Sequence, residues 1–249
     1  MNEKIRYHML DEFRGFIFLN MVAYHALWDL VYMYGVKADW YRNASGDIWQ
    51  KCVCCCFIFL SGFCWQLGKK PLKRGLLVFG AGIVITAVTM LVMPDARVIF
   101  GVLTFHGSAM LLFIPLSKIL KKIPAQPGAV VSILLFLFTY TVNDGYLGFF
   151  GRELVKLPES LYANWLTTYL GFPEKSFWST DYFSIFPWIF LYITGYFVHT
   201  IIIRKKQSLP EGLKKSLCPP LGFIGKHSLL IYMLHQPVIY GICMLIFGY

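Results

Sequence analysis

Charged residues are scarce in this chain. Only 14% of its 249 residues are Asp, Glu, Lys or Arg, whereas 57% are hydrophobic. This composition, with a mean hydropathy of +0.58, is too apolar for a soluble domain of this size. Several long runs carry almost no charge and are long enough to cross the roughly 30 Å hydrocarbon core of a membrane as helices. The composition therefore excludes a soluble protein and predicts a polytopic membrane protein.

Two further absences restrict the chemistry. No Gly-x-Ser-x-Gly sequence is present, which argues against a serine nucleophile held on a strand-to-helix elbow. No internal repeat pairs the two halves of the chain, and such repeats are typical of secondary transporters.

Seven cysteines are present, but four of them gather inside one apolar run, where we expect small packing residues. Lipid attachment and redox sensing are the alternatives for this cluster, which comprises Cys52, Cys54, Cys55 and Cys56.

The distribution of positive charge predicts a topology. Seven apolar runs are expected to span the membrane, at residues 10–34, 48–67, 75–93, 98–120, 128–147, 182–203 and 223–247. With the N-terminus inside, 16 of the 23 Lys and Arg residues fall on the inner side and seven on the outer side. Because positive residues concentrate on the cytoplasmic side, we expect a cytoplasmic N-terminus and an external C-terminus, in the cell inner (plasma) membrane. The same clusters explain the net charge of +10 without a nucleic-acid partner.

The predicted fold class is therefore all-α: a polytopic membrane helix bundle of about seven transmembrane helices. We expect one integral-membrane domain over residues 1–249. The segment 148–180, between the fifth and sixth runs, is rich in Gly, Pro and aromatic residues and is predicted to be irregular. A long irregular segment in a compact protein usually covers or forms a site.

The first apolar run carries ionisable groups that a bilayer interior should expel. At 100° per residue, Arg14 and His25 project within about 20° of each other, and Asp11 and Asp29 lie about 60° away, so all four share one face. Each such group costs roughly 2.5–3.5 kcal/mol at membrane depth, which makes the stripe a functional-site hypothesis. A structural use of Arg14 and Asp11, such as a buried ion pair between neighbouring helices, is the alternative.

His25 and Asp29 have the spacing of a general base and its orienting carboxylate. At i and i+4, the carboxylate can hold one imidazole nitrogen and leave the other to accept a proton. The acyl acceptor itself would then be the nucleophile. From the rise per residue, His25, His106 and His235 are expected at similar depth, where the latter two would position substrate or relay the proton. The alternatives are hydrogen-bonded packing histidines and a metal site formed by the three histidines with Asp29; we expect no metal.

Two further groups of residues are candidates for binding the reactants. Basic residues at the inner mouth would attract the phosphates of an acyl-coenzyme A, with Arg14 beside them. The alternative is that these basic residues only fix the topology and contact anionic lipid. On the outer side, aromatic rings beside carboxylates suit a sugar, and an interfacial aromatic belt is the alternative. The candidates are Lys69, Lys70, Lys73 and Arg74 for the donor, and Asp11, His106, His235, Asp144, Asp181 and Trp188 for the substrate.

Several motifs resemble those of a known family. The run from Asp11 to His25, with Arg14-Gly15, Met21 and Tyr24-His25, resembles the opening of the transmembrane acyltransferases. Further motifs are similar to the heparan-α-glucosaminide N-acetyltransferase catalytic-domain family in its short bacterial form. They are Asp181-Tyr182-Phe183, Phe186-Pro187-Trp188, Gly195-Tyr196, the run from Gly225 to Tyr232, and Leu234-His235-Gln236-Pro237.

The resemblance implies transfer of an acetyl group from cytoplasmic acetyl-coenzyme A to a sugar or glycan-type acceptor on the other side, by an N- or O-acetyltransferase. In the lysosomal branch the resemblance implies a histidine just after the first helix. Residues 37–49 contain none, so we expect His25 to take that role, as in the O-acyltransferase branch. The expected partners are acyl-coenzyme A, the acceptor and membrane lipid, with a homodimer also compatible. A proton-coupled transporter and a non-catalytic partner subunit are the rival interpretations.

Overall fold

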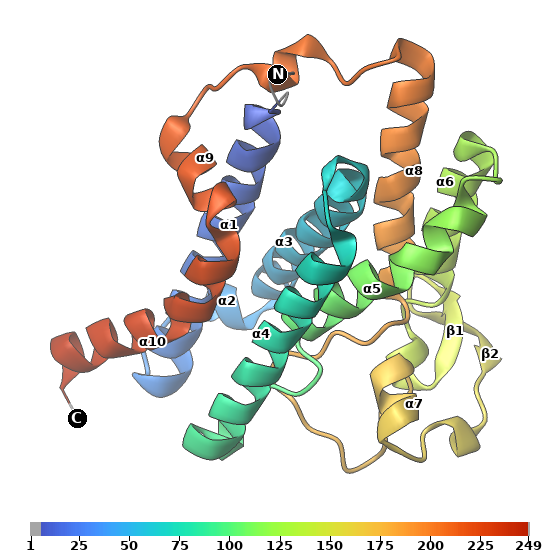
Figure 1. Ribbon diagram of the computed structural model, residues 1–249. Coiled ribbons are helices and arrows are strands. Elements are labelled where there is room, and N and C mark those ends of the chain that lie inside the picture. Colours follow the sequence, from blue (N-terminus) through green and yellow to red (C-terminus); the bar gives the residue numbers. More distant parts are fainter. Residues whose placement is uncertain (1–5, 249) are drawn as a thin grey trace. The chain divides into compact units, whose positions relative to one another are not determined.

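The structure, a computed structural model, describes residues 6–248; Lys4, which the charge count places inside, lies outside the described residues. The described chain divides into two compact units. The terminal unit comprises residues 6–57 and 206–248, and the central unit comprises residues 58–205. Figure 1 labels the elements of both, and the boundary falls within helix α3 (Ala44–Phe63).

The terminal unit is built around the first helix. Helix α1 (His8–Trp28) continues into a π-helical turn at Asp29–Met33, so the first predicted span is confirmed as one helical element. The last predicted span is divided at His227 into α9 (Pro219–Lys226) and α10 (Ser228–Phe247). Both helices pack against α1. A short helix, α2 (Asp39–Arg42), and a 3-10 turn at Glu211–Lys214 complete the unit.

Two glycines let α1 and α9 approach closely. A Cβ atom added to Gly15 would lie 2.0 Å from the backbone oxygen of Leu221, and one added to Gly225 would lie 1.8 Å from that of Asp11. Small residues at a helix crossing let backbones touch, which is how helices associate where lipid removes the hydrophobic driving force. This crossing fixes the segment that leads into α10 against the N-terminal half of α1.

A buried carboxylate reinforces the same contact. Glu12, on α1, is only 6% exposed. Its side chain accepts a hydrogen bond from Ser216 Oγ at 2.5 Å and from the backbone N–H of Leu217 at 3.0 Å. Because a buried charge is tolerated only where it is hydrogen-bonded, Glu12 ties the chain just before α9 to the first helix.

The central unit contains the remaining long helices. Helices α4 (Pro71–Val92) and α5 (Val102–Leu120) pack against each other, and Gly107 of α5 lies directly against Phe79 of α4. Helix α6 (Ala125–Phe138) contacts α8 (Trp188–Lys206), where Ser132 Oγ and Thr194 Oγ1 are 2.9 Å apart. Short 3-10 turns occur at Cys64–Leu67, Pro94–Ala96, Val142–Asp144 and Glu159–Leu161.

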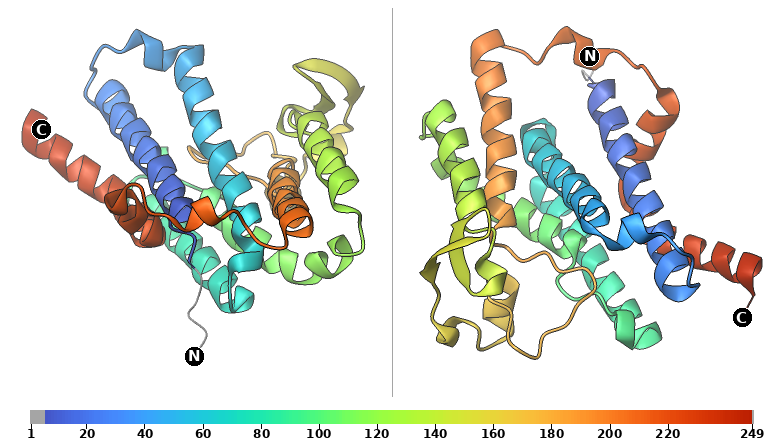
Figure 2. Two further views of the ribbon diagram at one scale, coloured as in Figure 1. Left: turned by 90° about the horizontal axis from the view of Figure 1, so that it is seen from above. Right: turned by 180° about the vertical axis from the view of Figure 1, so that it is seen from behind.

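The segment predicted to be irregular is partly regular. Strands β1 (Tyr146–Phe149) and β2 (Arg152–Lys156) form an antiparallel hairpin, with a bulge between Leu147 and Gly148. Helix α7 (Trp165–Leu170) begins at Asn164, whose side chain accepts hydrogen bonds from two backbone N–H groups of its first turn. Figure 2 shows the hairpin and α7 together at one end of the central unit. The glycines that marked this segment as irregular therefore include turn residues of a hairpin, such as Gly151 with φ +79°.

Six helical segments of the described chain are long and apolar enough to cross a membrane: His8–Met33, Ala44–Leu67, Pro71–Val92, Val102–Leu120, Ala125–Asp144 and Ser228–Phe247. An all-α polytopic membrane bundle is consistent with this. The sixth predicted run corresponds to α8, a helix of 19 residues that is not among the six. Its last three residues, Arg204, Lys205 and Lys206, are basic and lower its mean hydropathy. The count of seven and the sides of the termini stay predictions.

Candidate active site

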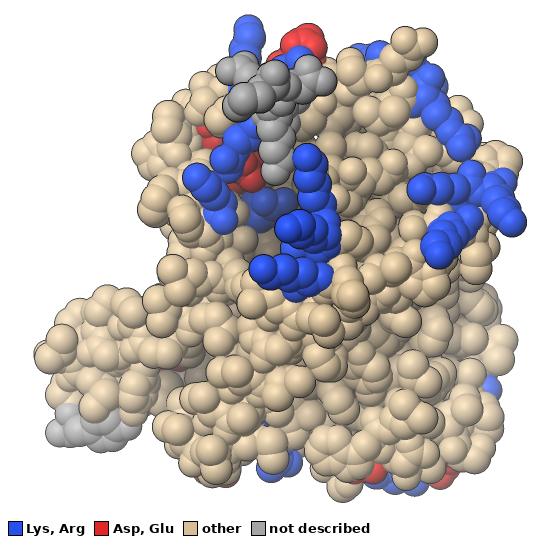
Figure 3. Space-filling view, in the orientation of Figure 1, with Lys and Arg blue, Asp and Glu red and all other residues tan. Residues whose placement is uncertain are grey.

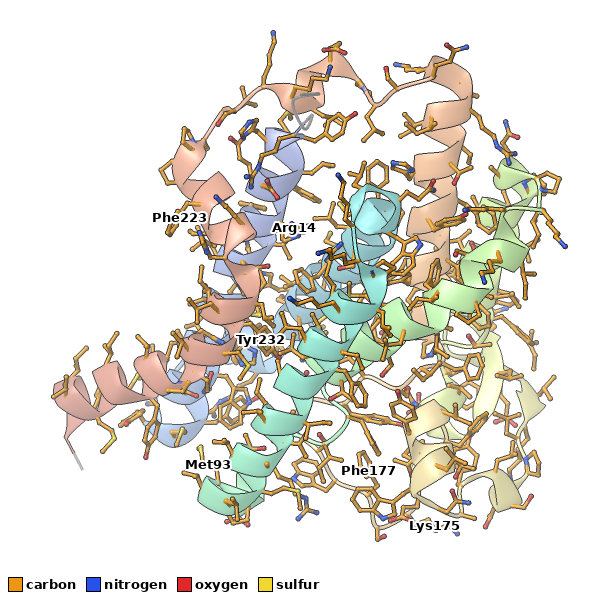
Figure 4. The ribbon with its side chains drawn as sticks, in the orientation of Figure 1. Arg14, Met93, Lys175, Phe177, Phe223 and Tyr232 are labelled. Atoms are coloured by element: carbon orange, nitrogen blue, oxygen red, sulfur yellow. The ribbon has the colours of Figure 1, made fainter. Side chains whose placement is uncertain are left out.

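Two histidines meet in the terminal unit. His25, on α1, and His235, on α10, have ring centroids 5.0 Å apart with an interplanar angle of 60°. His235 is 9% exposed, and its Nδ1 lies 2.6 Å from the backbone oxygen of Tyr232, one turn earlier on the same helix. Figure 4 labels Tyr232 on α10 and Arg14 on α1, the two helices that supply the pair. The structure thus brings together two of the three histidines that the sequence predicts at one depth.

Asp29 belongs to the same cluster. Its side chain is fully buried, and Oδ1 accepts a hydrogen bond of 2.7 Å from Nε2 of Gln236. Its Oδ2 and the Oε1 of Gln236 are buried without a hydrogen-bond partner among the described residues. The partner of Asp29 in this structure is therefore an amide on α10, and the predicted role of Asp29 in orienting His25 stays a prediction.

The backbone around Asp29 is unusual. The α-helix gives way at Asp29 to a π-helical turn, and the N–H of Tyr34 bonds to the Asp29 carbonyl at 3.2 Å. Such turns are rare and occur frequently at functional sites. Two side chains of α2 hold this part of the helix: Tyr41 Oη donates to the carbonyl of Tyr24 at 3.0 Å, and Arg42 donates to that of Val31 at 3.1 Å. The C-terminal end of this first helical element is therefore braced by α2.

Arg14 and Asp11 form an ion pair within α1. The Nη1 of Arg14 lies 3.2 Å from Asp11 Oδ1, and Arg6 reaches Asp11 Oδ2 at 2.7 Å. Both Arg14 and Asp11 keep about one fifth of their side-chain surface exposed, at 21% and 19%. The pair lies three residues apart on one helix, so it does not join two helices as the structural alternative supposed. Arg14 remains partly accessible to a ligand.

The predicted donor residues belong to the central unit. Lys69 and Lys70 precede α4, Lys73 and Arg74 lie in its first turn, and all four are exposed. The guanidinium of Arg74 folds back against Gly68. Figure 3 shows Lys and Arg side chains gathered near this end of α4 and at the end of α8, with uncharged surface along the helices. The free backbone N–H groups of a helix N-terminus add to this positive potential.

The predicted outer substrate residues, also in the central unit, have structural partners. Asp181 Oδ2 accepts the backbone N–H of Val102 at 3.0 Å, at the start of α5. Trp188, the first residue of α8, packs its ring among those of Phe136, Tyr140 and Phe183. The structure gives these two side chains bracing contacts, while their proposed contact with substrate stays a prediction.

The other two predicted substrate residues of the central unit differ sharply in burial. Asp144 lies exposed in a turn next to the hairpin. His106 is buried, at 4% exposed, within α5. Its predicted place beside His25 stays a prediction. Within residues 6–248, no group of three or more His, Cys, Asp or Glu side chains is arranged to hold a metal ion.

Two titratable groups in the segment 148–180, outside the spans, have shifted pKa values. The hydrogen bond from Lys175, at 3.0 Å, lowers the pKa of the Glu159 carboxyl. Burial raises the pKa of the Tyr162 phenol, whose hydroxyl donates to the carbonyl of Val142 at 2.5 Å. Both groups therefore keep their usual charge at neutral pH, the Glu159 carboxyl ionised and the Tyr162 phenol neutral.

Sequence reasoning missed two residues that make buried contacts in the terminal unit. Gln236 stands in the Leu234-His235-Gln236-Pro237 motif but received no role, although its position beside His235 was a usable signal. Glu12 lies next to Asp11, yet its side chain points toward a different segment, residues 216–217. No local pattern predicts a partner more than two hundred residues away.

Comparison with known proteins identifies the family. The profile described as heparan-alpha-glucosaminide N-acetyltransferase, catalytic, matches residues 6–237, which is nearly the whole chain. Comparisons with curated proteins and with solved structures gave no significant match. The matched region includes both histidines of the pair, Asp29 and Gln236. The chain therefore belongs to the heparan-alpha-glucosaminide N-acetyltransferase catalytic family, a family of membrane acetyltransferases.

Proposed function

We propose that the protein moves an acetyl or other acyl group from acyl-coenzyme A on the cytoplasmic side to a sugar or glycan-type acceptor on the other side of the membrane. The observation that carries this proposal is the cluster of His25, His235 and Asp29 at the meeting of α1 and α10. Ionisable groups at membrane depth are retained where they serve a function. Membership of an acetyltransferase family supports the same reaction class.

In this proposal His25 is the general base. Acyl transfer forms a bond between the acceptor oxygen or nitrogen and the thioester carbonyl carbon, and breaks the carbon–sulfur bond. The acceptor must lose a proton as it attacks, and an imidazole within hydrogen-bond reach can take it. Asp29, buried four residues further along the chain in the π-helical turn, would stabilise the imidazolium that forms. No protein nucleophile is required, so we favour direct transfer over an acyl-enzyme intermediate.

The donor would be held by cationic side chains. Arg14 and the four basic residues before and within the first turn of α4 are exposed or partly exposed, as binding of coenzyme A phosphates requires. Guanidinium groups bind phosphate through two parallel hydrogen bonds, and ammonium groups bind it as point charges. On the outer side, Asp144, Asp181 and Trp188 are the proposed contacts of the acceptor, with Asp11, His106 and His235 along its path.

A proton-coupled transporter that uses the same buried groups is the second candidate. It is favoured by one observation, the row of ionisable side chains along a membrane-spanning helix. The two functions differ in a simple readout. An acyltransferase consumes a thioester in proportion to the acylated acceptor formed, whereas a transporter moves solute with a proton and leaves the thioester intact.

The deciding experiment measures release of free coenzyme A thiol by the purified protein in detergent, with acetyl-coenzyme A and a panel of amino sugars, neutral sugars and glycans. We expect acceptor-dependent thiol release with at least one acceptor and an equal amount of acetylated product. The control variant is His8→Asn, which changes an exposed histidine at the start of α1. If no acceptor gives thiol release and proteoliposomes take up solute together with protons, the acyltransferase proposal is wrong and the transporter is favoured.

A further inference from the structure

The hydrogen bond made by His235 fixes where its proton resides. Nδ1 lies 2.6 Å from the backbone oxygen of Tyr232, and a carbonyl oxygen can only accept. Nδ1 therefore carries the hydrogen. In the neutral ring this leaves the lone pair on Nε2, so the second nitrogen is an acceptor. The helix thus imposes on His235 the tautomer that a proton acceptor acting through Nε2 needs.

The Nε2 atom of His235 is buried and accepts no hydrogen bond from residues 6–248. Nε2 of His235 has no hydrogen-bond partner among the described residues, and neither have Asp29 Oδ2 and Gln236 Oε1. The amide of Gln236 must turn its N–H toward the Asp29 carboxylate, which leaves its oxygen free. All three atoms are acceptors. Leaving a buried acceptor unpaired costs about 1–3 kcal/mol, and such groups are rare in native structures unless a ligand or a catalytic role completes them.

His25 differs from His235 in the hydrogen bonding of its ring nitrogens. Its ring contacts those of Tyr24, at 6.0 Å, and His235, at 5.0 Å, but within residues 6–248 no hydrogen bond holds either of its nitrogens. Neither tautomer of His25 is imposed by the protein. With ring centroids 5.0 Å apart, the ring edges lie within reach of each other directly or through one water. His25 is therefore free to carry its hydrogen on either nitrogen, whereas the hydrogen bond to Tyr232 leaves Nε2 of His235 as a proton acceptor.

We propose that His235 is the second member of a two-histidine relay, in which His25 takes the proton of the acceptor and passes the hydrogen on its other nitrogen to Nε2 of His235. This inference rests on the proposed acyl transfer. The acceptor forms its bond to the carbonyl carbon, the carbon–sulfur bond breaks, and the proton held on His235 returns through His25 to the thiolate sulfur. The relay therefore ends each cycle in its starting protonation state, without any other reactant.

The relay makes the two histidines act as a unit, which double variants can reveal. His235→Asn retains a donor near the place of Nδ1 and removes the base at Nε2. We expect it to lower kcat by about 100-fold or more, the contribution of a general base, with KM changed by less than about threefold. The double variant with His25→Asn should be no slower than His25→Asn alone, because residues that act as a unit are not additive.

A second measurement does not depend on turnover. In protein labelled with ¹⁵N-histidine and held in lipid nanodiscs, the ring nitrogens of His235 report the tautomer by their chemical shifts, and comparison with His235→Asn identifies the signal. We expect a protonated Nδ1 and a bare Nε2. His199→Asn is the matched control for labelling, expression and folding, since His199 is also a buried histidine on a long helix, but in the central unit.

The possible outcomes separate this inference from the proposed function. If the wild-type protein transfers no acyl group to any acceptor, the proposed function fails and the relay with it. If the wild type is active but His235→Asn keeps kcat within about threefold, or the two losses multiply, the relay alone is wrong. A proton on Nε2 of His235 in the nanodisc spectrum would also overturn it.

Discussion

At the scale of single residues, the account depends on how Asp29 is held. Gln236 supplies its one side-chain hydrogen bond in the described residues, and bonds to charged groups contribute roughly 1.5–3 kcal/mol. Replacing Gln236 by Leu should let the carboxylate turn, which we expect to lower kcat by about tenfold or more with little change in expression. Gln207→Ala, at an exposed position, is the control and should retain wild-type kcat. An unchanged kcat in Gln236→Leu would show that the orientation of Asp29 is irrelevant.

A second residue-scale prediction concerns stability. Glu12→Ala would leave the hydroxyl of Ser216 and the N–H of Leu217 without their acceptor. We expect a loss of about 1–3 kcal/mol in the free energy of unfolding, measured as a lower Tm in detergent. Glu211→Ala removes an exposed carboxylate that pairs with Lys214, and exposed pairs contribute only about 0–1 kcal/mol. Equal Tm values for the two variants would contradict the role given to Glu12.

At the scale of elements, the crossing of α1 and α9 is the contact that sets α10 beside α1. A methyl group at Gly15 would lie 2.0 Å from a backbone oxygen of α9, whereas one at Gly241 of α10 would meet nothing within 4 Å. Gly15→Ala should therefore lower both Tm and acyl transfer, because the helices must separate. Gly241→Ala should be neutral or stabilising by about 0.5–1 kcal/mol, since alanine favours a helix. A Gly15→Ala variant as stable and active as Gly241→Ala would mean that this crossing does not position the site.

The elements also show what sequence can predict. The first helix was predictable because its length, its apolar composition and the one-face stripe from Arg14 to Asp29 all depend on local spacing. The π-helical turn that begins at Asp29 was not, since no local pattern predicts it or the contacts that its residues make with α2 and α10. The hairpin at residues 146–156 was missed because its second strand is exposed throughout and carries no alternating apolar pattern. The rise per residue predicts a similar depth for His25 and His235. Whether the two rings meet depends on the rotation of each helix about its axis, which the sequence does not give.

At the scale of the whole molecule, the charge distribution predicts which segments face each side of the membrane. In a variant with its native cysteines replaced by serine, Lys175→Cys should react with an impermeant maleimide added to intact cells. Gln207→Cys should react only after the membrane is permeabilised. Both positions are exposed, so accessibility within the protein does not limit the reaction. The reverse pattern of labelling would invert the topology and place the proposed donor residues on the wrong side for cytoplasmic acyl-coenzyme A.

The central claim is that an imidazole on the first membrane helix removes the proton of the acyl acceptor. The most direct measurement follows radiolabelled acetyl transfer by the protein reconstituted in liposomes, with wild type, His25→Ala and His8→Asn compared at equal amounts of folded protein. A general base contributes about 10²–10⁴-fold, so His25→Ala should lose at least about 100-fold in rate while His8→Asn keeps the wild-type rate. Transfer by His25→Ala at the wild-type rate would contradict the account.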